Sequence, residues 1–219
     1  AFSQIQGISF RHNGDIIHNP PRPLIDNLEE LPYPGYHLVK DNIDKYHFAS
    51  MAGRDARFAL IEASRGGPHE CSFCTQWRHW EGRWRLKSPK RVAEEMEFCR
   101  RNYDSRFIWL TDDNFGAGTI AGRLADEILK RKISNDATWF VQARCDDIIS
   151  NRDVLPKLQR SGLNWVLLGV ENSELSTLSD FRKGITPEDA GTAVKLLKEN
   201  DIFAHTMFII GQRKDTAQS

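Results

Sequence analysis

The chain has 219 residues, and 40% of them are hydrophobic, which is enough for one sizeable core. Lys and Arg together number 30, as do Asp and Glu, so the formal net charge is zero. This balance argues against a partner held mainly by charge, such as duplex DNA or an anionic membrane. No apolar run approaches the ~20 residues that a membrane-spanning helix needs, and no signal peptide opens the sequence.

The number of cysteines indicates the cellular compartment, and the two ends of the sequence indicate whether it is a fragment. Four cysteines in a chain of this length lack the density of a secreted disulfide framework. We therefore expect a reducing, cytoplasmic compartment. The sequence begins at Ala1 without a methionine and ends at Ser219 in a polar stretch, so we expect a fragment of a longer protein.

The first segment indicates a β-hairpin over residues 4–18. Apolar residues flank Asn13-Gly14, a pair that favours the type I′ turn because both residues can take positive φ. Residues 19–36 are rich in proline, which fixes φ, lacks an N–H group and predicts an extended linker. Such a stretch is typical of a domain junction, so we assign residues 1–56 to a hairpin and linker that follow a preceding domain. The prolines are Pro20, Pro21, Pro23, Pro32 and Pro34.

From Phe58 onward, short apolar strands alternate with amphipathic helices. Strands that are apolar almost throughout are buried on both faces, which indicates parallel pairing with helices as connections. Repeated units of this kind predict an α/β fold, an incomplete barrel truncated after about the fifth strand, over residues 57–219. The predicted strands are residues 58–63, 107–110, 138–141, 165–168 and 206–210. The predicted helices are residues 89–103, 120–132 and 187–200, with a short helix after Ser150.

Capping residues mark where these helices begin. Ser88 precedes Pro89, and proline suits the first helical position because it has no N–H group to leave unpaired. Thr186-Pro187 introduces the last helix in the same way. Ser150, with Asp153 three residues later, predicts the start of the short helix.

Cys71 and Cys74 form a Cys-x-x-Cys pair shortly after the first predicted strand. Two thiolates at this spacing can hold one metal centre, either zinc or an iron–sulfur cluster. Since α/β barrels carry their active sites at the carboxyl ends of their strands, the pair predicts a metal centre within an active site.

Polar side chains also follow the next three predicted strands. Asp112 and Asp113 are candidates to bind an ammonium group or orient a substrate, and a turn that prepares the next helix is the alternative. Arg144 either clamps a carboxylate through its planar fork or pairs with a neighbouring aspartate. Glu171 is a candidate to bond ribose hydroxyls, with capping of the following segment as the alternative.

The stretch Gly67-Pro68-His69-Glu70-Cys71-Ser72-Phe73-Cys74 resembles the cluster loop of the radical S-adenosylmethionine (radical SAM) enzymes, Cys-x-x-x-Cys-x-aromatic-Cys. Cys71, Phe73 and Cys74 match the last three marked positions, whereas Gly67 occupies the first. The stretches Asp-Asp-Asn-Phe, Gly-Val-Glu-Asn-Ser and Phe-Ile-Ile-Gly at later strand ends are similar to radical SAM proteins with an N-terminal cobalamin-binding domain. That group includes methyltransferases and the anaerobic magnesium-protoporphyrin monomethyl ester oxidative cyclase.

The resemblance implies a partial (β/α)6-type barrel and a 4Fe–4S cluster that three cysteines hold, with S-adenosylmethionine (SAM) on the fourth iron. Reductive cleavage of SAM then gives a 5′-deoxyadenosyl radical for methyl transfer or oxidative cyclisation. The resemblance also implies cobalamin in a missing N-terminal domain, a small-molecule substrate such as a flat ring or a lipid, and an electron donor such as flavodoxin or ferredoxin. It assigns Cys71 and Cys74 as metal ligands, and Phe73, Asp112, Asp113, Arg144 and Glu171 as cofactor contacts.

Trp and Arg interleave over residues 75–85, directly after the cysteines. These residue types stack on bases and contact phosphates, but the zero net charge argues against nucleic acid. They also suit a flat, carboxylated ring substrate or plain loop packing. We expect a lid over the cluster, in which Trp77 or Trp80 shields it from water.

Two other interpretations stay open. Cys71 and Cys74 with His69 form a partial zinc site in a structural barrel, although zinc sites usually show a second nearby pair, and Cys99 and Cys145 are isolated. In the second interpretation, glycine at position 67 leaves the cluster without one of its ligands, and the chain is a degenerate, non-catalytic homologue.

Overall fold

A five-stranded, all-parallel sheet forms the centre of the protein. The structure is a computed structural model that describes residues 2–46, 56–115, 120–212 and 215. The strands follow one another across the sheet in chain order, which is the winding of a barrel, but the sheet stays open. The predicted α/β fold with an incomplete barrel is therefore confirmed. The strands are β3 (Phe58–Ile61), β6 (Phe107–Leu110), β7 (Thr138–Arg144), β8 (Leu163–Glu171) and β9 (Phe203–Phe208).

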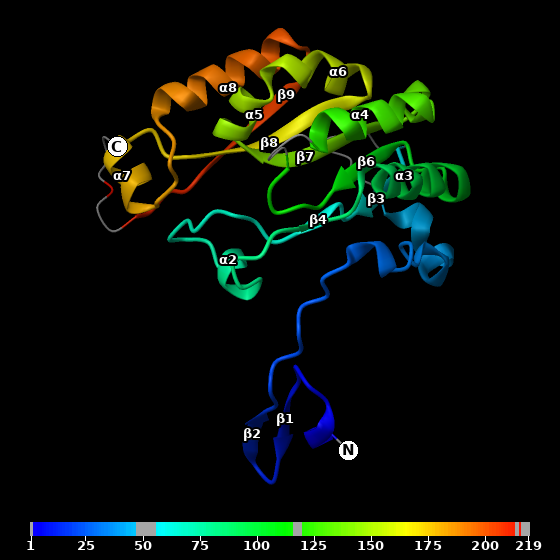
Figure 1. Cartoon of the computed structure of the whole chain (residues 1–219), viewed down its shortest axis with the longest axis vertical. Coiled ribbons are helices and arrows are strands. Elements are labelled where there is room, and N and C mark those ends of the chain that lie inside the picture. Colours follow the sequence, from blue (N-terminus) through cyan, green and yellow to red (C-terminus); the bar gives the residue numbers. More distant parts are fainter. Residues whose placement is uncertain (1, 47–55, 116–119, 213–214, 216–219) are drawn as a thin grey trace.

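The main helices lie together on one face of this sheet (Figure 1). They lie in the connections between successive strands and return the chain to the start of the next strand, as parallel pairing requires. They are α3 (Pro89–Tyr103), α4 (Ile120–Lys130), α5 (Cys145–Ser150), α6 (Leu155–Arg160) and α8 (Pro187–Glu199). Helix α7 (Leu175–Asp180) follows β8. The 3-10 turn η4 (Ile133–Asn135) lies between α4 and β7, and η5 (Arg152–Val154) joins α5 to α6. No helix in the described ranges is long and apolar enough to cross a membrane.

The two faces of the sheet bury different side chains. Ile108 and Leu110 of β6 face the helices and belong to the main hydrophobic core. Phe107 and Trp109 alternate with them and stack on Phe140 of β7, with ring centroids 5.0 and 4.9 Å apart. Alternation along β6 thus places aliphatic residues against the helices and aromatic residues on the opposite face.

The caps confirm two of the three predicted helix starts. The side chain of Ser88 accepts a hydrogen bond from the N–H of Arg91 at the start of α3. Thr186 and Asp189 form a complete capping box at the start of α8. The prediction for Ser150 is wrong, because this residue ends α5 and its hydroxyl donates to the carbonyl of Asp146 at 2.7 Å.

The strands are offset from some predicted bounds. β7 and β8 extend to Arg144 and Glu171, so both of these charged residues belong to strands rather than to the following loops. β9 begins at Phe203, three residues before the predicted start, and ends at Phe208. His205, in the paired stretch, interrupted the apolar run that marked the other strands.

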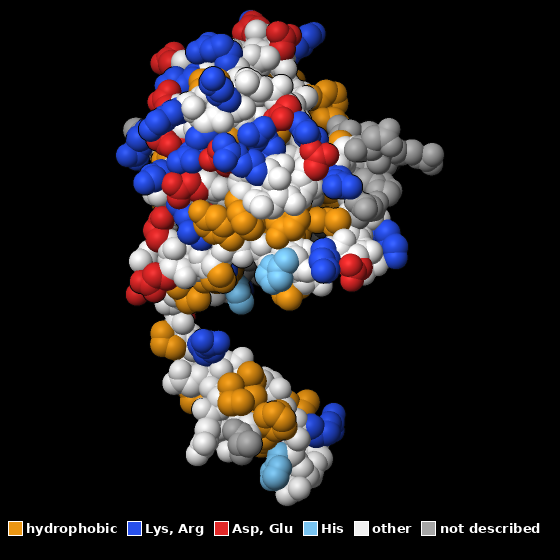
Figure 2. All heavy atoms as spheres, turned by 90° about the vertical axis from the view of Figure 1, so that its right-hand side faces the viewer, with side chains coloured by type: hydrophobic (Ala, Val, Ile, Leu, Met, Phe, Trp, Pro, Cys, Tyr) orange, Lys and Arg blue, Asp and Glu red, His pale blue; other side chains and the backbone are white. Residues whose placement is uncertain are grey.

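The predicted hairpin and linker are present at the N-terminus. Strands β1 (Ser9–His12) and β2 (Asp15–His18) pair in antiparallel, and Asn13 and Gly14 between them take positive φ of 51° and 95°. The structure begins with the 3-10 turn η1 (Phe2–Gln4). In Figure 2 the hairpin forms a separate lobe, while charges of both signs intersperse over the body on the face shown.

The linker contacts the barrel from Ile25 onward and includes 3-10 helices η2 (Leu28–Glu30) and η3 (Tyr36–Lys45). Arg85 donates to the carbonyl of Ile25 at 2.5 Å, and Arg91 donates to that of Leu31 at 2.6 Å. The hydroxyl of Tyr36 donates to the carbonyl of Leu60 at 3.0 Å and accepts from the N–H of Leu60 at 2.5 Å. Tyr36 therefore satisfies backbone groups at the outer edge of β3.

A small excursion after β3 covers the carboxyl side of the sheet. Strand β4 (Ser64–Arg65) pairs in antiparallel with β5 (Arg85–Leu86), and between them lie the cysteine loop and the short helix α2 (Gln76–His79). Figure 1 shows this excursion apart from the main helices. It brings the loop that follows the first barrel strand over the ends of the later strands.

Candidate functional site

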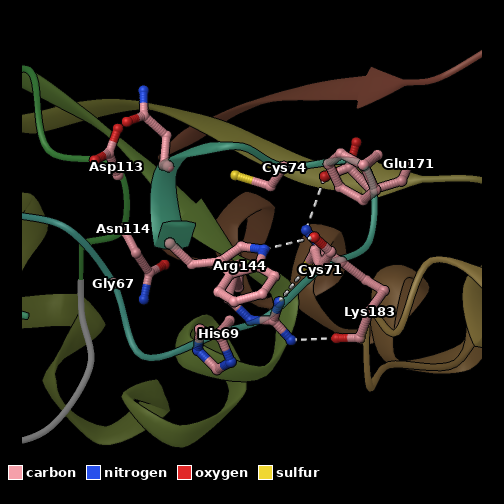
Figure 3. Close-up of a pocket in the computed structure, with 12 residues that line it drawn as sticks. Gly67, His69, Cys71, Cys74, Asp113, Asn114, Arg144, Glu171 and Lys183 are labelled. Carbon is pink, nitrogen blue, oxygen red and sulfur yellow. Dashed lines mark hydrogen bonds and ion pairs between the residues drawn. The ribbon is translucent and has the colours of Figure 1, made fainter. Parts of the chain in front are cut away.

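A cavity of about 160 Å³ lies where the cysteine loop meets the carboxyl ends of the strands. Figure 3 shows its side chains converging from the loop and from the ends of β7 and β8. The volume is below the ~300 Å³ typical of ligand pockets, so this cavity suits a compact group rather than a whole nucleotide. It is lined by Gly67, His69, Cys71, Phe73, Cys74, Gln76, Trp77, Asp113, Asn114, Arg144, Glu171 and Lys183.

The cysteine loop is anchored to the last residue of α7 and to the residue that follows it. The N–H of Ser72 donates to the carbonyl of Phe181 at 2.8 Å, and its hydroxyl donates to the carbonyl of Asp180 at 2.8 Å. The ring of Phe73 packs edge-on against Phe181 with centroids 5.0 Å apart. Cys71 is buried and Cys74 is partly exposed, and both are free thiols. The loop thus presents two sulfur ligands on a fixed backbone.

Arg144 connects β7 to this loop. Its Nη1 donates to Sγ of Cys71 at 3.5 Å, and Nε and Nη2 bind the two carboxylate oxygens of Asp146 at 2.9 and 3.0 Å. Nη2 also donates to the carbonyl of Lys183. The bidentate pair with Asp146 holds the guanidinium so that one side still faces the sulfur. This arrangement places Cys71 directly at the carboxyl edge of the sheet.

Glu171 and Lys183 form a buried ion pair on the opposite side of the cavity from Gly67 and Asn114 (Figure 3). Oε1 of Glu171 lies 2.7 Å from Nζ of Lys183. Glu171 has a left-handed backbone with φ of 69°, and the register between β8 and β9 shifts at this point. Nothing in the sequence pattern pointed to Lys183, since it follows no strand and belongs to no motif.

The two neighbouring aspartates occupy different places. Asp113 lines the cavity, and burial raises the pKa of its carboxyl. Asp112 is only 2% exposed and does not line this cavity. Its Oδ2 accepts from the N–H of Ala63 at 3.2 Å, and burial raises its pKa to about 6. Asp112 therefore ties the end of β6 to the chain leaving β3 and lies outside the lining of this cavity, and its cofactor contact stays a prediction.

His69 and Asn114 add two polar groups to the cavity wall. Burial, reinforced by the charge of Arg144, lowers the pKa of His69, so its imidazole is neutral at pH 7. Nδ2 of Asn114 donates to the carboxylate of Asp147 at 2.9 Å. The Oδ1 atom of Asn114 is buried and has no hydrogen-bond partner among the described residues.

Trp77 and Trp80, the two tryptophans predicted as a lid, occupy different positions. Trp77 lines the cavity, and its Nε1 donates to the carbonyl of Cys71 at 3.2 Å. Trp80 does not line the cavity and instead lies between Arg65 and Arg85, whose guanidinium carbons are 5.9 and 5.0 Å from its ring centroid. Of the two candidates, Trp77 is the one beside the sulfurs.

The chain resembles one protein family over most of its length. Residues 61–219 match the radical SAM superfamily. The chain is a member of the radical SAM superfamily. Membership implies a 4Fe–4S cluster and SAM as cofactors, and it agrees with the resemblance seen in the cysteine loop.

Known radical SAM relatives extend well beyond the length of this chain. A methyltransferase of Pyrococcus horikoshii, described as uncharacterized, is 32% identical over 98% of this chain and 44% of that protein. The anaerobic magnesium-protoporphyrin IX monomethyl ester cyclase of Rubrivivax gelatinosus is 30% identical over 98% of this chain and 38% of the cyclase. The structure of the cobalamin-dependent SAM radical enzyme OxsB with aqua-cobalamin bound has a TM-score of 0.75 at 19% identity, over 95% of this chain and 30% of OxsB. The chain thus spans less than half the length of each.

The donors at the cavity fit a radical SAM cluster at two of three cysteine positions. Cys71 and Cys74 line the cavity, while Cys99 and Cys145 do not. Both of these thiols lie in the core, where burial raises the pKa of Cys99 to about 12 and that of Cys145 to about 11 and so disfavours the thiolate. At Gly67, an added Cβ meets only the Cβ of Asn114, at 4.0 Å. The third position is therefore open in space but lacks a ligand.

The zinc alternative finds no support in the same geometry. In the described ranges, no three His, Cys, Asp or Glu side chains come together as a metal-binding group. Structural zinc sites need four protein ligands and catalytic sites need three. Two cysteines in an open cavity are closer to an incomplete cluster site than to a zinc site.

Proposed function

We propose that this chain is the core of a larger radical SAM enzyme, with Cys71 and Cys74 as cluster ligands. The observation that supports this most directly is the contact of Nη1 of Arg144 with Sγ of Cys71 at 3.5 Å, because it joins the cysteine loop to the carboxyl edge of the parallel sheet. Barrel enzymes assemble their active sites at that edge. The cluster, when bound, supplies the electron that cleaves SAM to methionine and a 5′-deoxyadenosyl radical.

The side chains around the sulfurs position the cofactors and limit the access of water. Arg144 places a positive charge beside Cys71 and offsets the negative charge of a ligating thiolate. Asp113 is a carboxylate for the ammonium group of SAM, and Phe73 borders the same space. Glu171 is a candidate to bind ribose hydroxyls, with its charge balanced by Lys183. Trp77 covers one side of the cavity and excludes water from the reacting centre.

The relatives suggest the reaction and the missing parts. We infer methyl transfer or oxidative cyclisation of a small molecule, such as a flat ring or a lipid, because a methyltransferase and a cyclase are among the similar proteins. Cobalamin in a preceding domain is consistent with the fold shared with OxsB. A flavodoxin or ferredoxin is a suitable electron donor. The free cysteines are consistent with a reducing cytoplasm.

Gly67 favours a second candidate, a degenerate homologue that no longer binds the cluster. Loss of one of three thiolates weakens a metal site, because each ligand contributes to affinity. A matched experiment separates the two. The chain is reconstituted anaerobically with iron and sulfide, and bound iron, optical spectra and spin-resonance spectra are recorded with and without SAM.

Cysteine variants identify where the iron binds. The double variant Cys71→Ala/Cys74→Ala should lose the bound iron, whereas Cys99→Ala/Cys145→Ala should keep it in the folded fraction. A spin-resonance signal that changes when SAM is added supports the enzyme. Absence of iron from the unchanged chain and from Gly67→Cys supports the degenerate homologue, and stoichiometric zinc without iron supports a structural metal site.

A further inference from the structure

The described lining of the cavity contains two thiols and no third metal ligand. Cys71 and Cys74 line it, and in the described ranges no three His, Cys, Asp or Glu side chains come together as a metal-binding group. Apart from any metal, such a pair is a dithiol, whose two sulfurs can bond to each other. Whether this pair does so depends on its backbone and on the access of each sulfur to solvent.

The backbone of the cysteine loop holds the two cysteines close together. Residues 72 and 73 form a turn, and the N–H of Cys74 donates to the carbonyl of Cys71 at 3.1 Å. A turn closed in this way keeps its first and fourth Cα atoms within ~7 Å, and disulfides join Cα atoms about 4.4 to 6.8 Å apart. Nε1 of Trp77 donates to the same carbonyl at 3.2 Å and so ties the turn to α2. A bond between Cys71 and Cys74 therefore suits this backbone.

The two sulfurs differ in their access to solvent. Cys71 is 6% exposed, and Nη1 of Arg144 donates to its Sγ at 3.5 Å. Cys74 is partly exposed, and its side chain lines the same cavity (Figure 3). The volume of about 160 Å³ gives the Cys74 side chain room to turn toward Cys71. A reagent that enters from solvent thus meets Cys74 first, which is the arrangement of a reactive cysteine beside a resolving one.

The other two cysteines are remote from this pair. Cys99 and Cys145 are fully buried and belong to the hydrophobic core. Neither of them lines the cavity. Among the residues that the structure describes, Cys71 is therefore the one thiol that shares a cavity with Cys74.

We propose that Cys71 and Cys74 form a reversible redox site that exchanges with small-molecule disulfides when the chain holds no metal. The thiolate of Cys74 attacks one sulfur of the external disulfide, which gives a mixed disulfide and releases one thiol. The thiolate of Cys71 then attacks Sγ of Cys74, which forms the Cys71–Cys74 bond and releases the second thiol. Two cysteine thiols are oxidised, the external disulfide is reduced by two electrons, and the two protons pass to the released thiolates.

The test equilibrates the chain, freed of metal with a chelator, in buffers with stepped ratios of oxidised to reduced glutathione. Samples are quenched with acid, denatured and alkylated, and the tryptic peptide over residues 66–78, which contains both cysteines, is measured by mass spectrometry. We expect one transition, in which this peptide loses the mass of two hydrogens and can no longer be alkylated. With reduced glutathione at about 0.1 mM, the disulfide should exceed the glutathione adduct of Cys74 by about tenfold, because a tethered thiol acts at millimolar effective concentration.

Single substitutions separate the roles of the two thiols. Cys71→Ser lacks the resolving thiol, so it should accumulate the mixed disulfide at Cys74. Cys74→Ser leaves only the buried thiol of the pair, which should react about tenfold more slowly than Cys74 does in Cys71→Ser. Cys99→Ala/Cys145→Ala should keep the transition of the unchanged chain, because the core thiols take no part. Circular dichroism checks that each variant is folded.

Two results would overturn the inference. One is the appearance of glutathione adducts on Cys71 and Cys74 without a bond between them. The other is a disulfide that links two chains through Cys74 in preference to the bond within one chain. Equal rates for the two single variants would overturn the order of the two steps. Since no arm contains iron, a negative result here is distinct from a failure of the proposed cluster site, which has its own test.

Discussion

Nζ of Lys183 lies 2.7 Å from Oε1 of Glu171, and their side chains are only 6% and 12% exposed. The pair joins the end of β8 to the loop before α8. Lys183→Met leaves the carboxylate of Glu171 buried without its cation, and we expect the free energy of unfolding to fall by roughly 3 kcal/mol. Urea denaturation followed by circular dichroism measures this loss.

An exposed pair provides the control for this prediction. Lys195 lies 3.8 Å from Glu199 on α8, and its side chain is 75% exposed. Lys195→Met should change the free energy of unfolding by less than about 0.5 kcal/mol. The double variant Lys183→Met/Glu171→Leu should recover most of the loss, since no charge is then left unpaired. Equal losses for Lys183→Met and Lys195→Met would show that burial is not what makes the first pair important.

Asp112 predicts a specific dependence of stability on pH. Burial raises its pKa from the ordinary 3.8 to about 6, so the folded state holds this proton more tightly than the unfolded state. Stability from this group is therefore fully present below about pH 4 and is lost as the pH rises through about 6. Asp112→Asn stays neutral, and relative to the unchanged chain it should gain roughly 3 kcal/mol between pH 4 and pH 7. A stability difference that is constant over this range contradicts the prediction.

Arg144 should control how firmly the cysteine loop holds iron. Arg144→Met removes the contact with Sγ of Cys71 and the anchors to Asp146 and Lys183. We expect about tenfold faster release of iron to a chelator from the reconstituted chain. Arg144→Lys should recover only part of this, because lysine keeps the charge but lacks the planar fork.

The neighbouring Arg182 is a matched control for Arg144, since it is exposed and lies next to Lys183 in sequence. Arg182→Met should release iron at the unchanged rate. If both variants release iron equally fast, a general loss of positive charge explains the effect and the contact with Cys71 does not.

The capping box at the start of α8 gives a prediction independent of any cofactor. Thr186→Ala removes the acceptor for the N–H of Asp189, which lies 3.2 Å from the threonine oxygen. The free energy of unfolding should fall by about 1 kcal/mol in urea titrations. Thr192→Ala, at an exposed position within the same helix, should have no such cost.

Local signals predicted the scaffold because they act within a few residues. Ser88 and Pro89 specified the start of α3, and Thr186 with Pro187 specified that of α8, since a cap and a fixed φ are effective wherever the helix packs. Ser150 carried the same signal and failed. Its hydroxyl bonds backward to Asp146 within α5, an option that the sequence does not distinguish from capping forward.

The site required information that only the packed sheet contains. Because barrel strands end at one edge of the sheet, polar residues at the strand ends were predicted to meet there. In the structure, Arg144 lies beside Cys71, and Asp113 and Glu171 line the same cavity. This rule could not tell Asp112 from Asp113, because adjacent residues on an extended chain point in opposite directions, and the sequence does not show which direction leads inward. Lys183 reaches the cavity from a loop whose path depends on α7 and α8.

The hydroxyl of Tyr36, bonded to both backbone groups of Leu60, occupies a position that a neighbouring strand would otherwise take. Exposed sheet edges are templates for pairing between molecules. The linker segment η3, which precedes β3, therefore also protects this edge against such pairing. Any rearrangement that withdraws η3 from β3 uncovers this edge and favours aggregation at the first barrel strand.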